Sequence, residues 1–273
     1  MESNLISLPL VTVIMPAYNS SKYITASINS ILAQLFTDFE LIIVDDCSTD
    51  NTVNIINSLG CKDSRIKLLS TTYNTGGPAL PRNLAIRESR GQYLAFCDSD
   101  DLWRPDKLLL QIAIFKSNPH IKFLSNRISI ISTSSHNLLA PSLLSVFILD
   151  LIRRFRLLPL PLFYFSNFIS LSSLVVHKSV FIYGFFNENP IYIAVEDFLF
   201  TRTLFENNCE YYFLNRTLSS WRNTSYSISS NQSSQLSKVI LALSNYQSRS
   251  MIMNIFRILA IFYYQIRLFL SRN

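Results

Sequence analysis

The sequence predicts an α/β fold with a mostly parallel central sheet and helices on its faces. Four apolar, β-rich runs occur early in the chain, a helical pattern follows each run, and the connections are too long for hairpins. This alternation is typical of βαβ units. The expected strands cover residues 10–15, 39–44, 66–69 and 93–96.

Polar residues follow these expected strands and are predicted to meet. The carboxyl ends of parallel strands lie at one edge of a sheet, where ligands of open α/β folds bind. The third helical pattern carries Arg82, whose side chain is expected to project toward the same edge. The segments that follow the first, second and fourth strands are Pro16 to Asn19, Asp45 with Asp46, and Asp98 to Asp101.

Three carboxylates within four residues follow the fourth strand. Along an extended chain Asp98 and Asp100 alternate, so one faces a ligand while the other reaches a cation. Carboxylate oxygens suit Mg²⁺ or Mn²⁺, which often share their coordination shell with substrate phosphates. The alternative is a solvated turn in which Asp101 caps a helix that begins near Pro105.

The composition limits the size of the hydrophobic core and indicates the cellular compartment. With 273 residues, 49% of them hydrophobic, the chain can bury one large core or two modest ones. The four cysteines lack metal-ligand spacing, and Met1 to Pro9 shows no cleavable signal, so a cytosolic protein with free thiols is expected. We expect one main domain over residues 1–230 and a helical extension over 231–273.

The positive charge is concentrated at the C-terminus. Glu210 is the last acidic residue, and the seven basic residues after it more than account for the net charge of +6. A basic, apolar tail favours an anionic membrane surface over nucleic acid. No run reaches the roughly 20 apolar residues that span a bilayer.

Residues 251–273 are expected to form an amphipathic helix. Such a helix either packs on the main domain or lies in the membrane interface, and the absence of acids favours the interface. Its expected polar side carries Asn254, Arg257, Tyr264, Gln265, Arg267 and Arg272, and its apolar face carries Ile255, Ile258, Leu259, Phe262, Ile266, Phe269 and Leu270.

Four motifs over residues 10–108 resemble the family 2 glycosyltransferases, which have the GT-A fold. They are Val-Ile-Met-Pro-Ala-Tyr-Asn, Glu-Leu-Ile-Ile-Val-Asp-Asp-x-Ser-Thr-Asp-x-Thr, Pro-Arg-Asn, and Tyr-Leu-Ala-Phe-x-Asp-Ser-Asp-Asp-x-Trp. The resemblance implies a donor half at 10–118 and an acceptor half at 119–230. Cys47 stands where the family usually has Gly, and a positive φ there would strain it.

The resemblance also implies a site for a nucleotide-diphosphate sugar, a UDP- or dTDP-sugar. By this carry-over Pro16, Ala17 and Tyr18 line the nucleoside, Asp46 and Arg82 hold the base and its surroundings, Asp98 meets the ribose or sugar, and Asp100 binds Mg²⁺ or Mn²⁺. Open alternatives remain. Pro16 and Tyr18 can simply shape a turn, Asp45 can cap or buttress, and Arg82 can pair with Glu88 on a helix surface.

Two adjacent acids in the second half are the expected catalytic pair. Glu196 and Asp197 precede a helical pattern, where acids are also favourable for dipole reasons alone. The resemblance implies that Asp197 is the general base and that Glu196 supports it or binds the acceptor. Arg222 follows Trp221 in a segment that resembles the family's aromatic-basic motif, which implies neutralisation of the diphosphate.

Further expectations concern the remaining segments. Strands are predicted over residues 121–131, 169–177 and 211–214. Residues 143–158 are expected to form either a buried helix with a solvated end or a segment that touches the membrane or gates the acceptor. An aromatic run follows over 160–165, and a mobile polar stretch is expected over 225–234.

The resemblance implies that the protein transfers a sugar, with inversion at the anomeric carbon, to a hydroxyl of a glycan. The acceptor is expected to be lipid-linked, and the expected setting is surface-polysaccharide or O-antigen assembly. The expected place is the cytoplasm, at the inner face of the cell membrane, with no nucleic-acid partner. The alternative is a non-catalytic nucleotide-sugar-binding protein or scaffold with the same fold. A nucleotidyltransferase is disfavoured, because no glycine- and lysine-rich phosphate loop occurs near the N-terminus.

Overall fold

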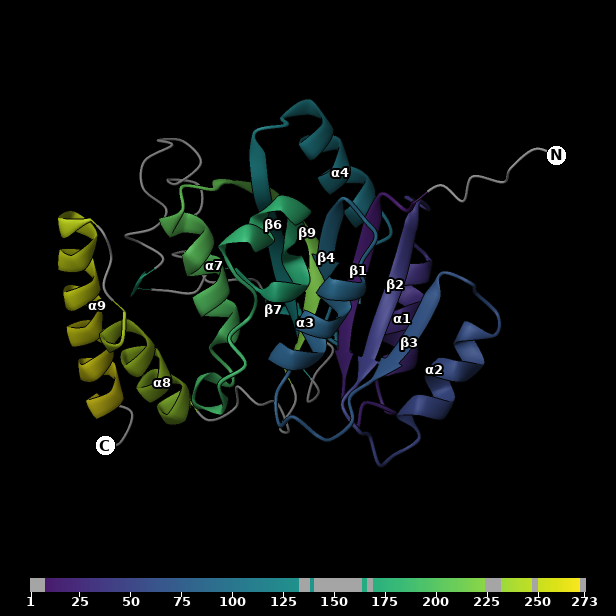
Figure 1. Ribbon diagram of the computed structural model, residues 1–273, viewed down its shortest axis with the longest axis horizontal. Coiled ribbons are helices and arrows are strands. Elements are labelled where there is room, and N and C mark those ends of the chain that lie inside the picture. The colour runs from purple at the N-terminus through teal and green to yellow at the C-terminus, as the bar shows by residue number, and fades with distance from the viewer. Residues whose placement is uncertain are drawn as a thin grey trace.

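A computed structural model describes residues 8–132, 138–139, 164–165, 169–223, 232–246 and 250–270. The expected segment at 143–158, most of the aromatic run and most of the polar stretch at 225–234 lie outside these residues. The described chain forms one mixed sheet with helices on both faces and two helices stacked at one end (Figure 1).

The strand order in the sheet is β3-β2-β1-β4-β8-β6-β9-β5, with β7 paired to β6. The first four of these strands run parallel, and β8 pairs antiparallel to β4. The strands are β1 (Val11–Ala17), β2 (Phe39–Asp45), β3 (Ile66–Ser70), β4 (Tyr93–Phe96), β5 (Leu102–Trp103), β6 (Ile121–Ser132), β7 (Leu138–Leu139), β8 (Val175–His177) and β9 (Glu210–Asn223). The four parallel strands predicted from the sequence are confirmed within one or two residues.

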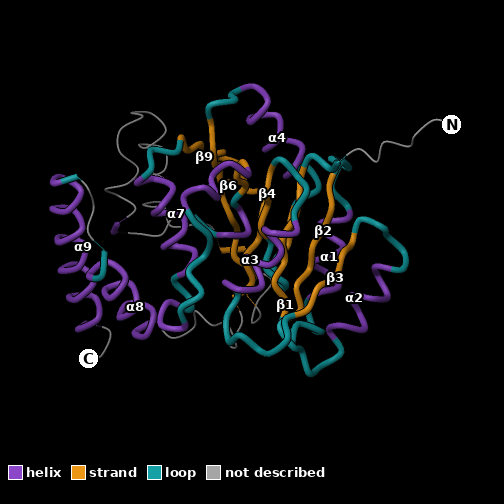
Figure 2. Tube along the Cα trace, in the orientation of Figure 1, coloured by secondary structure: helices purple, strands orange, loops and turns teal. Residues whose placement is uncertain are grey.

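Helices cover the sheet because alternate strand residues are apolar on both faces. Along β1, Val13 and Met15 pack with the helices of one face, whereas Ile14 packs with those of the other. The first face carries α1 (Ile24–Leu32), α2 (Thr52–Gly60) and α4 (Lys107–Ser117), and the second carries α3 (Ala79–Glu88) and α7 (Glu196–Glu206). Figure 2 shows these helices on either side of the strands.

Two strand predictions in the second half had the wrong length. The strand expected at 169–177 is only β8, because Leu171–Ser173 form a 3-10 turn whose polar groups bond to neighbouring segments. Conversely, the strand expected over residues 211–214 is β9, which has 14 residues. Its pairing with β6 continues through a polar stretch whose sequence is typical of a loop.

The C-terminal helices α8 (Gln232–Ser244) and α9 (Met251–Leu270) lie beside α7 at the end of the molecule away from α2 (Figure 1). Leu236 of α8 and Tyr264 of α9 are buried in the same core cluster as α7. The division at residue 230 therefore stays a prediction, since the extension shares the main core.

Helix α9 is apolar on two sides. Ala260 and Tyr264 are buried against the protein, so Tyr264, expected on the polar side, instead anchors the helix. All seven residues of the expected apolar face are exposed, from 45% at Ile266 to 68% at Phe269. Residues 253–270 are also long and apolar enough to cross a membrane by length and composition alone, although the sequence analysis expected no run of that length.

Candidate functional site

The loops after β1 and β2 meet at the carboxyl edge of the sheet, the lower edge in Figure 1. Asn19 ties them together, because its Oδ1 accepts a hydrogen bond of 2.8 Å from the Thr49 N–H. Of the three residues expected to line a nucleoside, Ala17 is buried, Pro16 is half-buried and Tyr18 is 50% exposed. Only Tyr18 therefore offers a large open surface.

Asp46 lies inside the loop network rather than facing the crevice. One oxygen accepts from the Thr71 hydroxyl at 2.9 Å, and the other accepts from the Thr75 hydroxyl at 2.9 Å. The Thr75 N–H lies 3.0 Å from both oxygens. Asp46 thus fixes the loop after β3, and its predicted contact with a donor base stays a prediction.

The two residues next to Asp46 were also singled out in the sequence. Asp45 buttresses the turn, as its Oδ2 accepts from the Ser48 N–H at 3.0 Å. Cys47 has a φ of 60°, in the left-handed region that favours glycine. The positive φ that a glycine would favour is therefore present at Cys47.

Asp98 to Asp101 form a turn, and the expected extended alternation is wrong. The Asp101 N–H donates to the Asp98 carbonyl at 3.1 Å. Ser172 braces the turn, because its Oγ accepts from the Asp98 N–H at 3.1 Å. Asp101 is fully buried and its Oδ1 accepts from the Arg222 N–H at 2.9 Å, so it does not cap α4, where Asp106 holds the N-cap position.

Asp100 carries a charge that its surroundings do not neutralise. Burial, followed by the neighbouring Asp98 carboxylate, raises the pKa of Asp100 to about 6. The Arg222 guanidinium does not offset this fully, because its Nε donates to the Asp100 carbonyl at 2.9 Å and its plane lies over the Tyr23 ring. An oxygen ligand of this kind fits a divalent cation.

The protein itself supplies few ligands for such a cation. Among the residues that the structure describes, no cluster of three or more His, Cys, Asp or Glu side chains is arranged to hold a metal ion. Mg²⁺ characteristically binds through one or two carboxylates together with substrate phosphates. Asp100 can therefore supply one oxygen ligand to such a cation, and the described residues do not complete its coordination shell.

Arg82 joins the two halves of the site. Its side chain is only 4% exposed, and its Nη2 donates to Asp98 at 2.7 Å while its Nη1 donates to Glu196 at 2.8 Å. The helix-surface alternative was wrong, because Glu88 pairs instead with Lys67. A buried guanidinium that spans two carboxylates fixes the N-terminus of α7 next to the turn after β4.

Asp197 is a buried carboxylate with a raised pKa. Burial, followed by the charge of Glu196, raises the pKa of Asp197 to about 7, and its Oδ1 accepts from the Phe198 N–H at 2.7 Å. A carboxylate that titrates near neutral pH accepts a proton more readily than an ordinary one. The other oxygen of Glu196, Oε2, is buried and has no hydrogen-bond partner.

Helix α8 holds the segment that leads into this pair, a contact that sequence reasoning missed. Lys238 Nζ donates to the Ile193 carbonyl at 2.8 Å, just before Ala194, whose φ is 74°. Ser172, which braces the acidic turn, was missed as well. Neither residue belongs to a motif, so no local pattern would have found them.

The fold combines a parallel half that presents an acidic turn with a second half that adds a carboxylate pair. Residues 12–181 match the family model described as glycosyl transferase family 2. The chain therefore belongs to glycosyl transferase family 2.

Bacterial polysaccharide enzymes are among the relatives. The chain is 43% identical over 126 residues to the UDP-Glc:alpha-D-GlcNAc-diphosphoundecaprenol beta-1,3-glucosyltransferase WfgD of Escherichia coli, covering 46% of this chain and 48% of that protein. It is 45% identical over 104 residues to TuaG of Bacillus subtilis, a putative teichuronic acid biosynthesis glycosyltransferase, covering 38% and 41%. The chain thus spans about half the length of the curated relatives it matches.

Solved structures share the fold. Staphylococcus aureus TarS 1-349 superposes with a TM-score of 0.68 at 22% identity, over 94% of this chain and 72% of that one. The mannosyltransferase PcManGT from Pyrobaculum calidifontis, in complex with GDP-Man and Mn²⁺, gives 0.69 at 14% identity, over 95% and 74%. At these identities the likeness establishes the fold alone.

The raised pKa of Asp197 predicts a stability effect. A carboxyl whose pKa is higher in the folded state stabilises that state below its ordinary pKa of 3.8, and the stabilisation is lost as the pH rises through about 7. Asp197→Asn should therefore raise the free energy of unfolding by about 1–2 kcal/mol at pH 8, and by far less at pH 4. Urea denaturation at the two pH values measures this.

Asp50→Asn is the matched control, because its expected effect has the opposite sign. Burial raises the pKa of Asp50, but hydrogen bonds from Ser21 and Thr52 outweigh it and lower the pKa to about 2. This variant should destabilise the protein at pH 8. An Asp197→Asn protein that is less stable than wild type at pH 8 would contradict the assignment.

Proposed function

We propose that the protein transfers a sugar from a nucleotide-diphosphate sugar to a glycan hydroxyl, with inversion at the anomeric carbon. The observation that carries this proposal is the bridge from Asp98 through Arg82 to Glu196, which sets a candidate base beside a candidate donor site. Inversion needs a single displacement, so one base suffices and no covalent intermediate forms.

The donor is proposed to be a UDP-sugar, with a dTDP-sugar as the second choice. WfgD is named as a glucosyltransferase that uses UDP-glucose, and TarS has been solved in complex with UDP. In this chain we assign the nucleoside to Pro16, Ala17, Tyr18 and the loop braced by Asp46, and the ribose or sugar to Asp98. Arg82 then supports the donor site by fixing Asp98.

The leaving diphosphate is assigned to the turn after β4. Asp100 would hold a Mg²⁺ or Mn²⁺ ion, which would supply positive charge at the departing diphosphate. Arg222 lies at the same turn through its bond to the Asp100 carbonyl, so its guanidinium adds charge close by. In support of Mn²⁺, the structural neighbour PcManGT was solved with that ion.

Asp197 is proposed to accept the proton of the acceptor hydroxyl. Its pKa of about 7 matches that task at neutral pH. Glu196, neutralised in part by Arg82, keeps a negative field at Asp197 and so maintains the raised pKa. A protein that only bound nucleotide-sugars would have no use for such a base, which disfavours the scaffold alternative.

The acceptor is proposed to be a lipid-linked glycan of a bacterial surface polysaccharide. The acceptor in the name of WfgD is GlcNAc linked to diphosphoundecaprenol, a lipid carrier. The exposed face of α9 supports a membrane location, because its apolar side chains stand in a region of 63 residues without a single acid. We propose that this face lies in the anionic cytoplasmic surface of the cell membrane.

Loss of Asp100 should abolish turnover. With UDP-glucose and a short-chain GlcNAc-diphosphate-lipid acceptor, Asp100→Ala or chelation with EDTA should reduce UDP release at least 100-fold, because the leaving group loses its counter-charge. Coupled detection of UDP gives the rate. Asp106→Ala is the control, as Asp106 pairs with Arg104 outside the turn. Full activity in EDTA would refute the metal role.

Charge on the exposed face of α9 should release the protein from membranes. Ile258→Glu with Phe262→Glu should abolish flotation with vesicles containing phosphatidylglycerol, because both side chains are more than half exposed. Ile182→Glu is the control, since Ile182 is 78% exposed elsewhere on the protein. Equal flotation of all three proteins would defeat the membrane assignment.

A further inference from the structure

A tight turn leads the chain into α7 and its carboxylate pair. The Val195 N–H donates to the Tyr192 carbonyl at 3.0 Å, so residues 192–195 form a β-turn. Ile193 has a φ of −56° and a ψ of 131°, and Ala194 has a φ of 74°. These angles match a type II turn, in which the third residue has a positive φ.

Alanine is an unusual residue for the third position of such a turn. A residue with a Cβ resists a positive φ, and Gly or Asn is therefore the usual choice there. In a type I turn the same residue has a negative φ, and the peptide between the second and third residues faces the opposite way. The sequence of the turn favours type I, so a contact from outside is needed to hold the type II form.

Lys238 of α8 makes that contact. Its Nζ donates to the Ile193 carbonyl at 2.8 Å, and this carbonyl belongs to the peptide that reverses between the two turn types. Gln235, one helical turn earlier, brings its Nε2 to 3.5 Å from the next carbonyl of the turn. Asn245, just after α8, donates to the Tyr192 hydroxyl at 3.1 Å. Helix α8 and its end therefore contact three successive residues of the turn.

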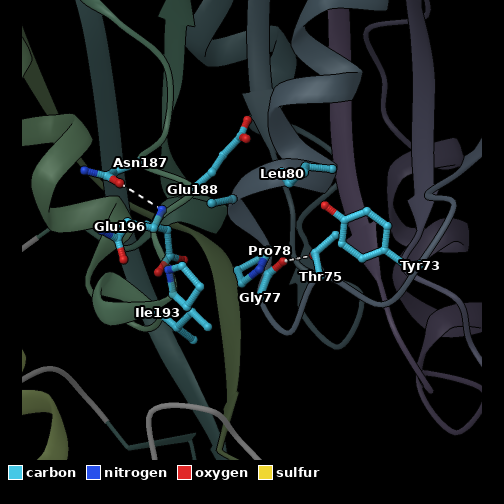
Figure 3. Close-up of a pocket in the computed structure, with 12 residues that line it drawn as sticks. Tyr73, Thr75, Gly77, Pro78, Leu80, Asn187, Glu188, Ile193 and Glu196 are labelled. Carbon is cyan, nitrogen blue, oxygen red and sulfur yellow. Dashed lines mark hydrogen bonds between the residues drawn. The ribbon is translucent and has the colours of Figure 1, made fainter.

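The loop before α3 confines the turn from another side. A Cβ placed on Gly77 would lie 2.9 Å from Cγ1 of Ile193, and Figure 3 shows the two residues next to each other. Helix α8 is itself anchored, because Arg257 of α9 donates to the Leu243 carbonyl at 2.7 Å. A positive charge is favourable at that end of a helix. The side chain of Ile193 is thus packed by one element while its carbonyl is bound by Lys238.

The turn controls the surroundings of Asp197. Burial is the main cause of the raised pKa of this carboxyl, and the charged groups that act on it are Glu196, Arg82 and Asp98. The Arg82 bridge fixes those three side chains. The backbone that carries Asp197 is fixed by the turn, because a reversed peptide at Ile193 would change the direction in which α7 begins.

We propose that Lys238 is a positioning residue for Asp197: its hydrogen bond keeps the peptide between Ile193 and Ala194 in the type II orientation and so fixes the first turn of α7. The effect on turnover rests on the proposed glycosyl transfer, whereas the effect on the position of Asp197 does not. The C-terminal extension then contributes to the placement of the base, in addition to its proposed place at the membrane.

The first test follows the pKa of Asp197 by NMR in protein with isotope-labelled aspartate carboxyls, and it needs no turnover. The resonance is identified by its absence in Asp197→Asn. In Lys238→Met the pKa should fall from about 7 toward the ordinary 3.8, because the displaced carboxylate gains contact with water. Loss of the ammonium charge alone would raise that pKa, so the direction of the change separates position from charge.

A rescue variant tests the turn itself. In the double variant Lys238→Met with Ala194→Gly the pKa of Asp197 should return toward about 7, because glycine adopts a positive φ without help from α8. Asn245→Ala should lower the pKa in the same direction by a smaller amount, and its exposed side chain makes a loss of folding unexpected. Lys178→Met is the matched control, since Lys178 also donates to a backbone carbonyl, that of Ser89.

The second test is the UDP-release assay with the lipid-linked acceptor. Lys238→Met should lower kcat about tenfold and leave UDP affinity unchanged, because a small displacement of a reacting group is costly to the chemical step. The acidic limb of its pH–rate profile should move to lower pH, in line with the lower pKa of the base. Ala194→Gly in the same chain should recover most of the lost kcat.

An unchanged or raised pKa of Asp197 in Lys238→Met would overturn the proposal, and so would a double variant that recovers neither the pKa nor kcat. Equal losses of kcat and UDP affinity would contradict it as well, because they would show that Lys238 only supports the fold. If the pKa changes occur as expected but the wild-type protein releases no UDP with any donor and acceptor, the proposed function fails and the positioning role of Lys238 stands.

Discussion

The buried guanidinium of Arg82 is the contact on which the site depends. It binds Asp98 at 2.7 Å and Glu196 at 2.8 Å, two carboxylates 98 positions apart in the chain. A buried charge is tolerated only when partners surround it, so neither carboxylate can leave without a large cost. The parallel half of the sheet and the N-terminus of α7 are thereby fixed against each other.

The Arg82 guanidinium pairs with Asp98 and Glu196 but not with the other carboxylates nearby, Asp197 and Asp100. Asp197 therefore keeps a pKa near 7 and Asp100 one near 6, in both cases chiefly because burial disfavours the charged form. The surplus of negative charge is a cost to stability, and such costs are typical of functional sites. Under the proposed function, Asp197 would take up a proton and Asp100 would bind a cation.

The sequence predicted most of what local pattern controls. The strand-end acids followed from the βαβ pattern, whereas the GT-A plan and the place of Asp197 beside Asp98 followed from the family resemblance. What it missed depends on tertiary contacts. Asp46 turns inward because Thr71 and Thr75 offer donors. Likewise, α9 buries Tyr264 because its neighbours are apolar on that side, which a helical projection of one segment cannot reveal.

A double-mutant cycle on Arg82 and Glu196 tests the central claim most directly. The free energy of unfolding would be measured by urea denaturation for wild type, Arg82→Met, Glu196→Gln and the double variant. If the bridge holds the two halves together, the single changes should be non-additive by about 1–3 kcal/mol. Effects that add to within about 0.5 kcal/mol would contradict the account.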